Sequence, residues 1–162
     1  MTIVVLSWLV AIPLLGVVTG LRTMLPMAVL CWFAYLHHLP VHGTWAFWVA
    51  HPVSVIVFTL LAAGELVGDK LPKTPDRTSP GPLMARLIFA GLVGAIVAAG
   101  LRGSGTEGVI LAVVGAAMGA FGGYLVRREL VELLECKDWY VAVAEDALAL
   151  VCAIFAMGVI TG

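Results

Sequence analysis

Residues 64–86 read GELVGDKLPKTPDRTSPGPLMAR, and almost everything on either side of this stretch is apolar. It holds four of the nine lysine and arginine residues of the chain, together with four of its eight prolines. Proline breaks a helix because it lacks the amide hydrogen and clashes with the preceding turn. We therefore predict a single polytopic domain in which a polar hinge over residues 71–82 joins two apolar halves, 1–70 and 83–162.

The composition is that of a membrane protein. Of the 162 residues, 62% are apolar and 12% are charged, and the mean hydropathy is +1.08. A soluble domain has about 25% charged and about 45–50% apolar residues, so a soluble fold could not hide this much apolar surface. A helix needs roughly 20 residues to cross the hydrocarbon core of a bilayer. We predict an all-α membrane protein with six transmembrane helices, whose first partner is the lipid bilayer.

The apolar runs define the predicted spans, which cover residues 3–19, 24–36, 52–68, 83–101, 108–126 and 140–160. Between the second and third spans, residues 37–51 are predicted to form an interfacial loop. Its Trp45, Phe47 and Trp48 would anchor it, because amphipathic aromatic rings prefer the headgroup level. The leucines and glutamates of residues 127–139 predict a short amphipathic helix lying in the interface.

The basic residues predict the orientation. With six spans, eight of the nine lysine and arginine residues fall on one side, and Arg102 falls on the other. Basic residues concentrate on the cytoplasmic side of a membrane protein. We therefore predict that the hinge is cytoplasmic and both termini are extracytoplasmic. No lysine or arginine precedes Arg22, so we expect no cleaved signal peptide.

Two short matches indicate an internal repeat. The sequence Gly-Leu-Arg occurs at residues 20–22 and again at 100–102, and the same spacing of 80 residues separates Glu65 from Glu145. Because each half has three spans, the second half would enter the membrane from the opposite side. The prediction is a pair of inverted three-helix repeats, an arrangement found in many transporters.

Charged side chains near the cytoplasmic ends of the spans form the candidate site. A charge inside a bilayer is costly and faces either a partner or a water-filled cavity. One interpretation is a pocket for an ion, a proton or an anionic headgroup, and the other is a set of structural ion pairs. The predicted substrate- or ion-binding residues are Arg22, Glu65, Asp69, Arg86, Glu145 and Asp146.

Small residues recur at the spacing of helix turns. Gly115, Gly119 and Gly123 stand four residues apart in the fifth predicted span, and Gly16 and Gly20 form a similar pair in the first. Such spacing lets two helices approach closely, so we predict helix packing there. Because six short spans enclose little volume, we also predict a homo-oligomer.

Histidine and cysteine offer no convincing metal site. His37, His38, His42 and His51 cluster in one loop, where they could bind zinc or copper or sense pH, but Pro40 disrupts a helical spacing. Three widely separated cysteines form neither a disulfide framework nor a metal cage; they are Cys31, Cys136 and Cys152. No nucleotide or nucleic-acid motif is present in the sequence. We predict no metal, no cofactor and no nucleic-acid partner.

Five segments resemble domain of unknown function 4126, a family of small bacterial integral membrane proteins. They are GLRTMLP (20–26), ELVGDKLPKTPDR (65–77), an arginine followed by AGLVGA (86–95), GAFGGYLVRR (119–128) and AEDALAL (144–150). The resemblance implies a membrane fold in the bacterial cytoplasmic (inner) membrane and supplies no mechanism. It singles out Arg22, Pro26, Glu65, Asp69, Lys70, Pro72, Asp76, Arg86, Glu145 and Asp146.

A second, fainter resemblance concerns GLRTMLPMAV at residues 20–29, which is similar to the GLTEFLPVSS motif of the undecaprenyl-pyrophosphate phosphatases. Thr23 stands where that motif has its acidic residue, and Ala28 and Val29 stand in place of the serines. The companion P-G-x-S-R-S motif is missing from the sequence. The resemblance implies a scaffold for lipid-linked phosphates rather than phosphatase chemistry.

The leading hypothesis is therefore a transporter or channel-like protein for a small ion or solute. Glu65 would be the central cation or proton site, Arg22 and Arg86 its counter-charges or anion ligands, and Asp69 with Asp146 a cytoplasmic gate. One alternative is a membrane enzyme or carrier acting on lipid-linked phosphate. The other is a structural membrane subunit whose charges only dock partners.

Overall fold

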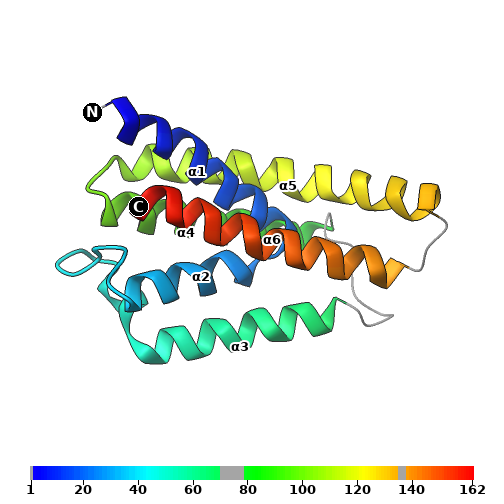
Figure 1. The fold of residues 1–162 in the computed structure, drawn as a ribbon, viewed down its shortest axis with the longest axis horizontal. Coiled ribbons are helices and arrows are strands. Elements are labelled where there is room, and N and C mark those ends of the chain that lie inside the picture. The colour runs from blue at the N-terminus through cyan, green and yellow to red at the C-terminus, as the bar shows by residue number, and fades with distance from the viewer. Residues whose placement is uncertain (1, 70–78, 135–137) are drawn as a thin grey trace.

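The computed structural model describes residues 2–69, 79–134 and 138–162, with side chains from residue 8 onward except at 134 and 138. Within these ranges the chain forms six α-helices, one short 3-10 helix and no strand (Figure 1), which confirms the all-α prediction. The helices are α1 (Thr2–Leu21), α2 (Met24–Tyr35), η1 (Phe47–Ala50), α3 (Pro52–Gly68), α4 (Pro80–Gly100), α5 (Gly105–Leu134) and α6 (Asp138–Thr161).

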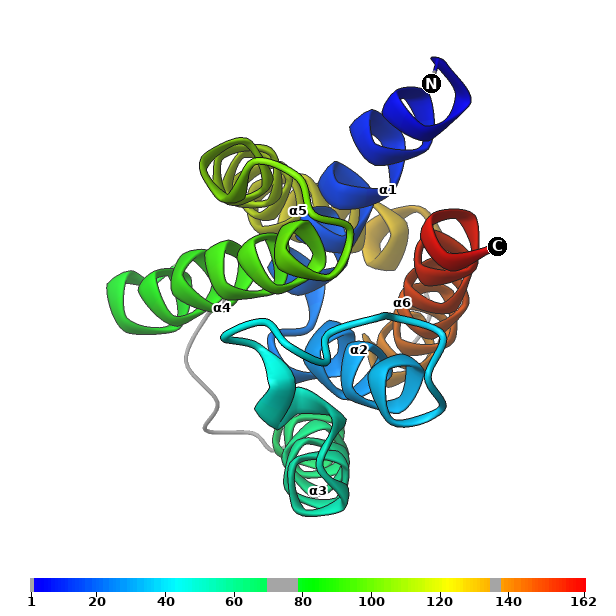
Figure 2. The same ribbon diagram turned by 90° about the vertical axis from the view of Figure 1, so that its left-hand side faces the viewer.

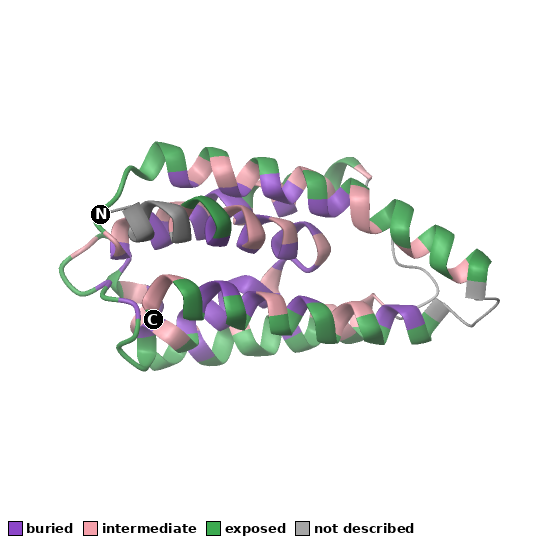
Figure 3. Cartoon of the chain, turned by 45° about the horizontal axis from the view of Figure 1, so that its top comes forward, coloured by how far each residue is buried: buried purple, intermediate pink, exposed green. Residues whose placement is uncertain are grey.

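The helices form one elongated bundle. Successive α-helices run in opposite directions along its long axis, and both chain ends lie at the same end of the bundle (Figure 1). Seen end-on, α1 lies among α4, α5 and α6, whereas α3 lies at the edge against α2 (Figure 2). The buried residues gather on the sides of the helices that face one another (Figure 3).

Three of the helices are long and apolar enough to cross a membrane. They are α4, most of α5 and most of α6, each with a mean hydropathy of at least 2.0 over an 18-residue window. The apolar stretches described in α1, α2 and α3 are shorter, between 10 and 17 residues. At 1.5 Å per residue, the 12 residues of α2 cover about 18 Å of a hydrocarbon core about 30 Å thick. Three candidate spans are thus shown, and the prediction of six remains a prediction.

A seam of glycines brings α1 and α5 into backbone contact. A Cβ atom at Gly16 would lie less than 3.0 Å from the carbonyl group of Ala112, and one at Gly119 would meet that of Val17 as closely. We call Gly16, Gly20, Gly115 and Gly119 the glycine seam, since a Cβ at any of the four would strike backbone atoms of the facing helix. The predicted close packing of these small residues is confirmed.

The predicted interfacial helix over residues 127–139 is wrong. Helix α5 continues without interruption to Leu134, and α6 begins at Asp138. The physical reason is local: no proline or glycine follows Gly123 before the end of α5, and its glutamates, leucines and arginines are good helix formers. The amphipathic segment therefore extends a membrane helix beyond its apolar part.

The hinge is shorter than predicted. Helix α4 begins at Pro80 instead of residue 83, and Pro80 and Pro82 occupy its first turn. Proline is tolerated there because the first amide groups of a helix have no partner within the helix. The earlier part of the hinge, residues 70–78, lies outside the described residues.

The loop over residues 37–51 is confirmed in part. Most of it is irregular, but it ends in η1 and folds back onto the bundle with Leu39, Val41, Ala46 and Val49 fully buried. Of the three predicted anchors, Trp45 and Phe47 are exposed, whereas Trp48 lies beside Phe58 of α3. The loop is therefore a packed cover for one end of the bundle as well as an exposed aromatic surface.

Candidate charged site at the break between α1 and α2

The site is built around a two-residue break. Helix α1 ends at Leu21 and α2 begins at Met24, so only Arg22 and Thr23 connect them. The side chain of Thr23, the residue before α2, makes no capping hydrogen bond. The first amide groups of α2 therefore need an acceptor from another part of the chain.

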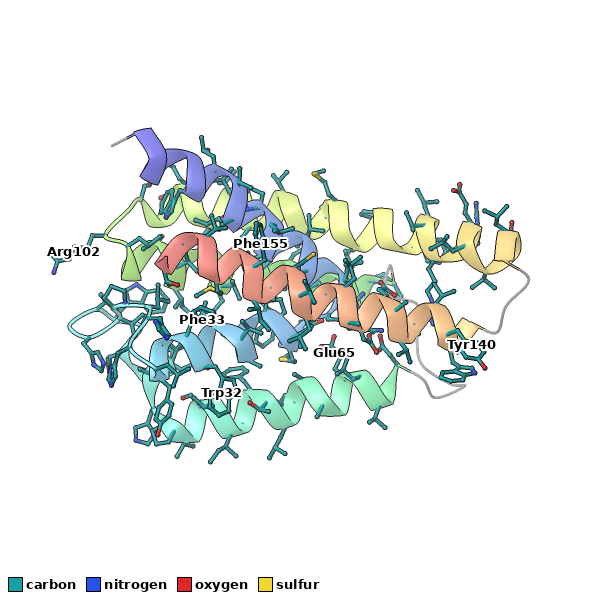
Figure 4. All side chains as sticks on the ribbon, in the orientation of Figure 1. Trp32, Phe33, Glu65, Arg102, Tyr140 and Phe155 are labelled. Carbon is teal, nitrogen blue, oxygen red and sulfur yellow. The ribbon has the colours of Figure 1, made fainter. Side chains whose placement is uncertain are left out.

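Glu65 of α3 supplies that acceptor. Its Oε1 atom accepts a hydrogen bond from the amide of Thr23 at 2.7 Å, and its Oε2 atom accepts one from the amide of Met24 at 2.8 Å. A carboxylate is favourable at this position because the N-terminus of a helix carries partial positive charge. Glu65 points from α3 toward α2 (Figure 4), and its two hydrogen bonds tie these helices together.

Arg22 is the centre of the site. Its side chain is fully buried, its Nε atom donates to Oδ1 of Asp146 on α6 at 2.6 Å, and its Nη1 atom donates to Oδ2 of Asp69. The two aspartates remain partly accessible, with side-chain exposures of 12% for Asp146 and 19% for Asp69. One guanidinium group thus connects the break with α6 and with Asp69, the C-cap of α3.

One atom of this guanidinium group stands out. The Nη2 atom of Arg22 is buried, and within the part of the chain that the structure describes it has no hydrogen-bond partner. A buried donor without a partner is costly, and more so when it is charged. We call Arg22, Glu65, Asp69 and Asp146 the charge cluster.

The other two predicted site residues lie near this cluster in the bundle. Glu145 of α6 faces Arg127 of α5, with 3.7 Å between Oε2 and Nη1. Arg86 is 4% exposed and lies in the second turn of α4, at the end of the bundle where α3 also terminates (Figure 1). The structure therefore brings Arg22, Glu65, Asp69 and Asp146 into direct or adjacent contact and pairs Glu145 with Arg127.

The sequence did not reveal the role of two backbone groups, the amides of Thr23 and Met24. The only available signal was Pro26, which is typical of a first helical turn and locates the start of α2. Nothing in the sequence points from that start to Glu65, which lies more than 40 residues away.

The charges of the site do not balance among the described residues. Four carboxylates (Glu65, Asp69, Glu145 and Asp146) accompany three guanidinium groups (Arg22, Arg86 and Arg127). Asp76, Lys70, Lys73 and Arg77, which the sequence groups with them, lie outside the described residues. No group of three or more metal-binding side chains occurs among the residues described.

The histidines do not converge. His37 and His42 approach within 3.3 Å at their ring nitrogens, but His38 lies against Phe33, and His51 accepts a hydrogen bond from the amide of Val53 at the start of α3. Two of the cysteines, Cys31 and Cys152, are free. Cys31 is fully buried in the core, as predicted for a packing residue, and Cys136 lies outside the described residues.

Comparison with known proteins adds no relative. No family model, no curated protein and no solved structure matches the chain. The resemblances to domain of unknown function 4126 and to the undecaprenyl-pyrophosphate phosphatases therefore stay predictions.

Proposed function

We propose that the protein is an integral membrane protein that moves a small ion or solute across the bacterial cytoplasmic membrane through the charge cluster. The observation that carries this proposal is the fully buried guanidinium group of Arg22, shared by Asp69 and Asp146. Burying charges costs more than their attraction returns unless the geometry is excellent, and apolar residues would lock the helices at lower cost. Charges retained inside a membrane bundle generally mark a substrate or ion pathway.

The break between α1 and α2 supports the same proposal. Interrupted helices in transporters place helix ends at the binding site, where partial charges meet the substrate. Here the break exposes the first amides of α2 to Glu65, and Arg22 lies within the break itself. In the proposed cycle Asp69 and Asp146 move away from Arg22 and admit the solute. Glu65 then exchanges its hydrogen bonds with the amides of Thr23 and Met24 for other partners.

We propose six spans with both termini outside the cytoplasm. Support comes from the alternating helix directions and from the position of Arg102, which lies with the chain ends and away from Glu65 (Figures 1 and 4). Helix α1, with 20 residues, is long enough to cross the membrane, and the shorter helices α2 and α3 would cross it with help from the packed loop over residues 37–51 that connects them. The inverted repeat and the homo-oligomer remain part of this proposal.

A second candidate, handling of a lipid-linked phosphate, is favoured by one observation. Arg22 and Arg86 are both buried, and arginine is well suited to binding phosphate oxygens. The structural alternative would use the same ion pairs only to hold helices together.

A flux assay on purified protein in liposomes tests the proposal. We would impose proton, sodium, potassium and chloride gradients and compare the wild type with Asp146→Asn and Glu65→Gln. Glu132→Gln is the matched control, because Glu132 is an exposed carboxylate on α5. Transport predicts a wild-type flux that both cluster variants reduce at least tenfold while the control keeps it. If folded wild-type protein carries none of these ions, transport of them is excluded and the lipid-phosphate candidate takes precedence.

A further inference from the structure

We infer that the N-terminus of α2, together with Arg22, is a binding site for an oxyanion of the carboxylate or phosphate type, and that Glu65 occupies this site as a tethered competitor. The inference uses the site of the proposed function and names the class of solute that it would take. The role of this site in transport rests on the proposed function. Its ability to bind an oxyanion rests on separate observations.

The first observation is the way in which Glu65 is bound. Each of its two carboxylate oxygens accepts one backbone amide, from Thr23 at 2.7 Å and from Met24 at 2.8 Å. Two adjacent amides at the start of a 12-residue helix form an anion site, since both the donors and the helix dipole favour negative charge. The structure shows this site holding a carboxylate that belongs to the protein itself.

The second observation is independent of the helix. Arg22 is fully buried, and its Nη2 atom has no hydrogen-bond partner among the described residues. Its Nη1 atom donates to Asp69, which follows Glu65 by four residues, so the guanidinium group lies on the same side of α3 as the Glu65 carboxylate that holds the two amides. A phosphate has more acceptor oxygens than the two of Glu65, and a free carboxylate is not held in place by α3, so either could reach both the amides and Nη2.

Charge explains why the oxyanion must replace Glu65 and cannot bind beside it. Arg22 already faces two carboxylates, those of Asp69 and Asp146, so a further anion next to Glu65 would meet strong repulsion. An exchange of one carboxylate for one oxyanion leaves the local charge almost unchanged. The exchange also releases α3 from the start of α2, which couples occupancy of the site to the position of a helix.

Access to the site is available from one end. Asp69 and Asp146 are partly exposed while Arg22 between them is fully buried, so the two aspartates form the boundary between the cluster and the outside of the bundle. An oxyanion approaching from that end would reach Arg22 once these side chains part.

Titration calorimetry with sodium phosphate and sodium acetate tests the inference on full-length protein in neutral detergent micelles. Removing the tethered competitor should increase anion affinity, so we expect Glu65→Ala to bind phosphate at least tenfold more tightly than the wild type. Asp69→Asn is the comparator, because it removes one negative charge next to Arg22 and leaves the amides occupied. Circular dichroism and a melting temperature establish that each variant is folded.

Two results would overturn the inference. One is a Glu65→Ala protein that is folded and binds phosphate no more tightly than the wild type. The other is an equal gain in Asp69→Asn, which would reduce the effect to general electrostatics. A double variant, Glu65→Ala with Arg22→Lys, should lose most of the gain, because lysine keeps the charge but lacks the planar donor group.

A second experiment distinguishes a lipid headgroup from a free anion as the ligand. Phosphate binding is measured again in micelles that contain either phosphatidic acid or phosphatidylcholine. If phosphatidic acid blocks phosphate binding to Glu65→Ala, a lipid headgroup reaches the site; if it does not, the site takes a free anion. The outcome is also distinct from that of the flux assay. Flux without an affinity gain removes the oxyanion site and keeps transport, whereas an affinity gain without flux keeps the anion site and excludes transport of the four ions tested.

Discussion

The C-terminal half of α1 and the break that follows it are held in place by opposite means. Along the glycine seam, α1 and α5 meet through backbone atoms and small residues, and no charged side chain takes part in those contacts. At the break that follows, Arg22 and the first amides of α2 are held by carboxylates from α3 and α6. A seam of backbone contacts has one close-packed arrangement, whereas charges can exchange partners. This difference indicates that α1 and α5 form a rigid pair. Helices α2, α3 and α6 are joined at the break by charged contacts that can change.

The largest expected effect comes from breaking the rigid side. In Gly119→Leu the new side chain would strike the backbone of α1 at Val17, and the two helices would have to separate. Overpacking typically costs about 1–3 kcal/mol and more where backbone is struck, so we expect little folded, monodisperse protein after purification. Gly122→Leu is the control, because a Cβ at Gly122 meets nothing within 4 Å. Equal melting temperatures for the two variants would contradict the close contact.

The next effect comes from removing the centre of the charged side. Arg22→Met leaves Asp69 and Asp146 without the guanidinium group that they share, and losing one partner of a buried ion pair costs about 3–5 kcal/mol. We expect a large fall in melting temperature in detergent. Adding Asp146→Asn should restore part of the loss, since it removes one stranded charge. A double variant that is no more stable than the single one would show that the guanidinium–carboxylate pairs do not limit stability.

A moderate effect is expected where the charged side meets a helix end. Glu65→Gln keeps one acceptor oxygen but loses the charge and the second hydrogen bond to the start of α2. Capping interactions are worth about 0.5–2 kcal/mol, so the free energy of unfolding should fall by about 1 kcal/mol. Hydrogen exchange at the amides of Thr23 and Met24 should speed up, while exchange along α5 stays the same. Unchanged exchange at these two amides would count against the cap.

The smallest effect is expected at the ion pair between Arg127 and Glu145, which allows a comparison with the contacts of Arg22. Arg127 and Glu145 are partly exposed, and 3.7 Å separates their charged atoms. This distance is longer than the 2.6 Å between Arg22 and Asp146, so we expect the pair to contribute up to about 1 kcal/mol and to weaken with added salt. Arg127→Gln should therefore lower the melting temperature only slightly, and less at 1 M salt than at low salt. A loss as large as that of Arg22→Met would place this pair in the same class as the buried cluster.

The sequence predicted the apolar helices and the glycine contacts because both follow from local patterns. It also placed Arg22, Glu65, Asp69 and Asp146 near one another, since helix ends on one side of a bundle share a level. It could not pair them: the separations of 47 residues for Arg22 and Asp69 and 124 for Arg22 and Asp146 depend on how each helix is rotated. The sequence also does not predict that Glu65 caps α2, because a threonine before a helix, here Thr23, ordinarily caps the helix itself.

The two errors in the sequence-based description have a common origin. The prolines of the hinge predict a helix break, and the leucines and glutamates of residues 127–139 predict a separate interfacial helix. Pro80 instead starts α4, and the glutamates continue α5. In each case the residue type is compatible with a helix end or a helix interior, and its neighbours decide which of the two forms.

The burial of α2 has an evolutionary consequence. Eight of its 12 residues are buried, whereas only Val55 and Ala62 are buried in the 17 residues of α3. If α3 faces lipid, its exposed positions need only an apolar side chain. We therefore expect these positions to tolerate most apolar substitutions in a saturation mutagenesis library. Helix α2 is solvated by protein on most sides and must fit its neighbours atom by atom. Its tolerance of substitution should resemble that of the interior of a water-soluble protein, although it lies in a bundle with helices long and apolar enough to cross a membrane.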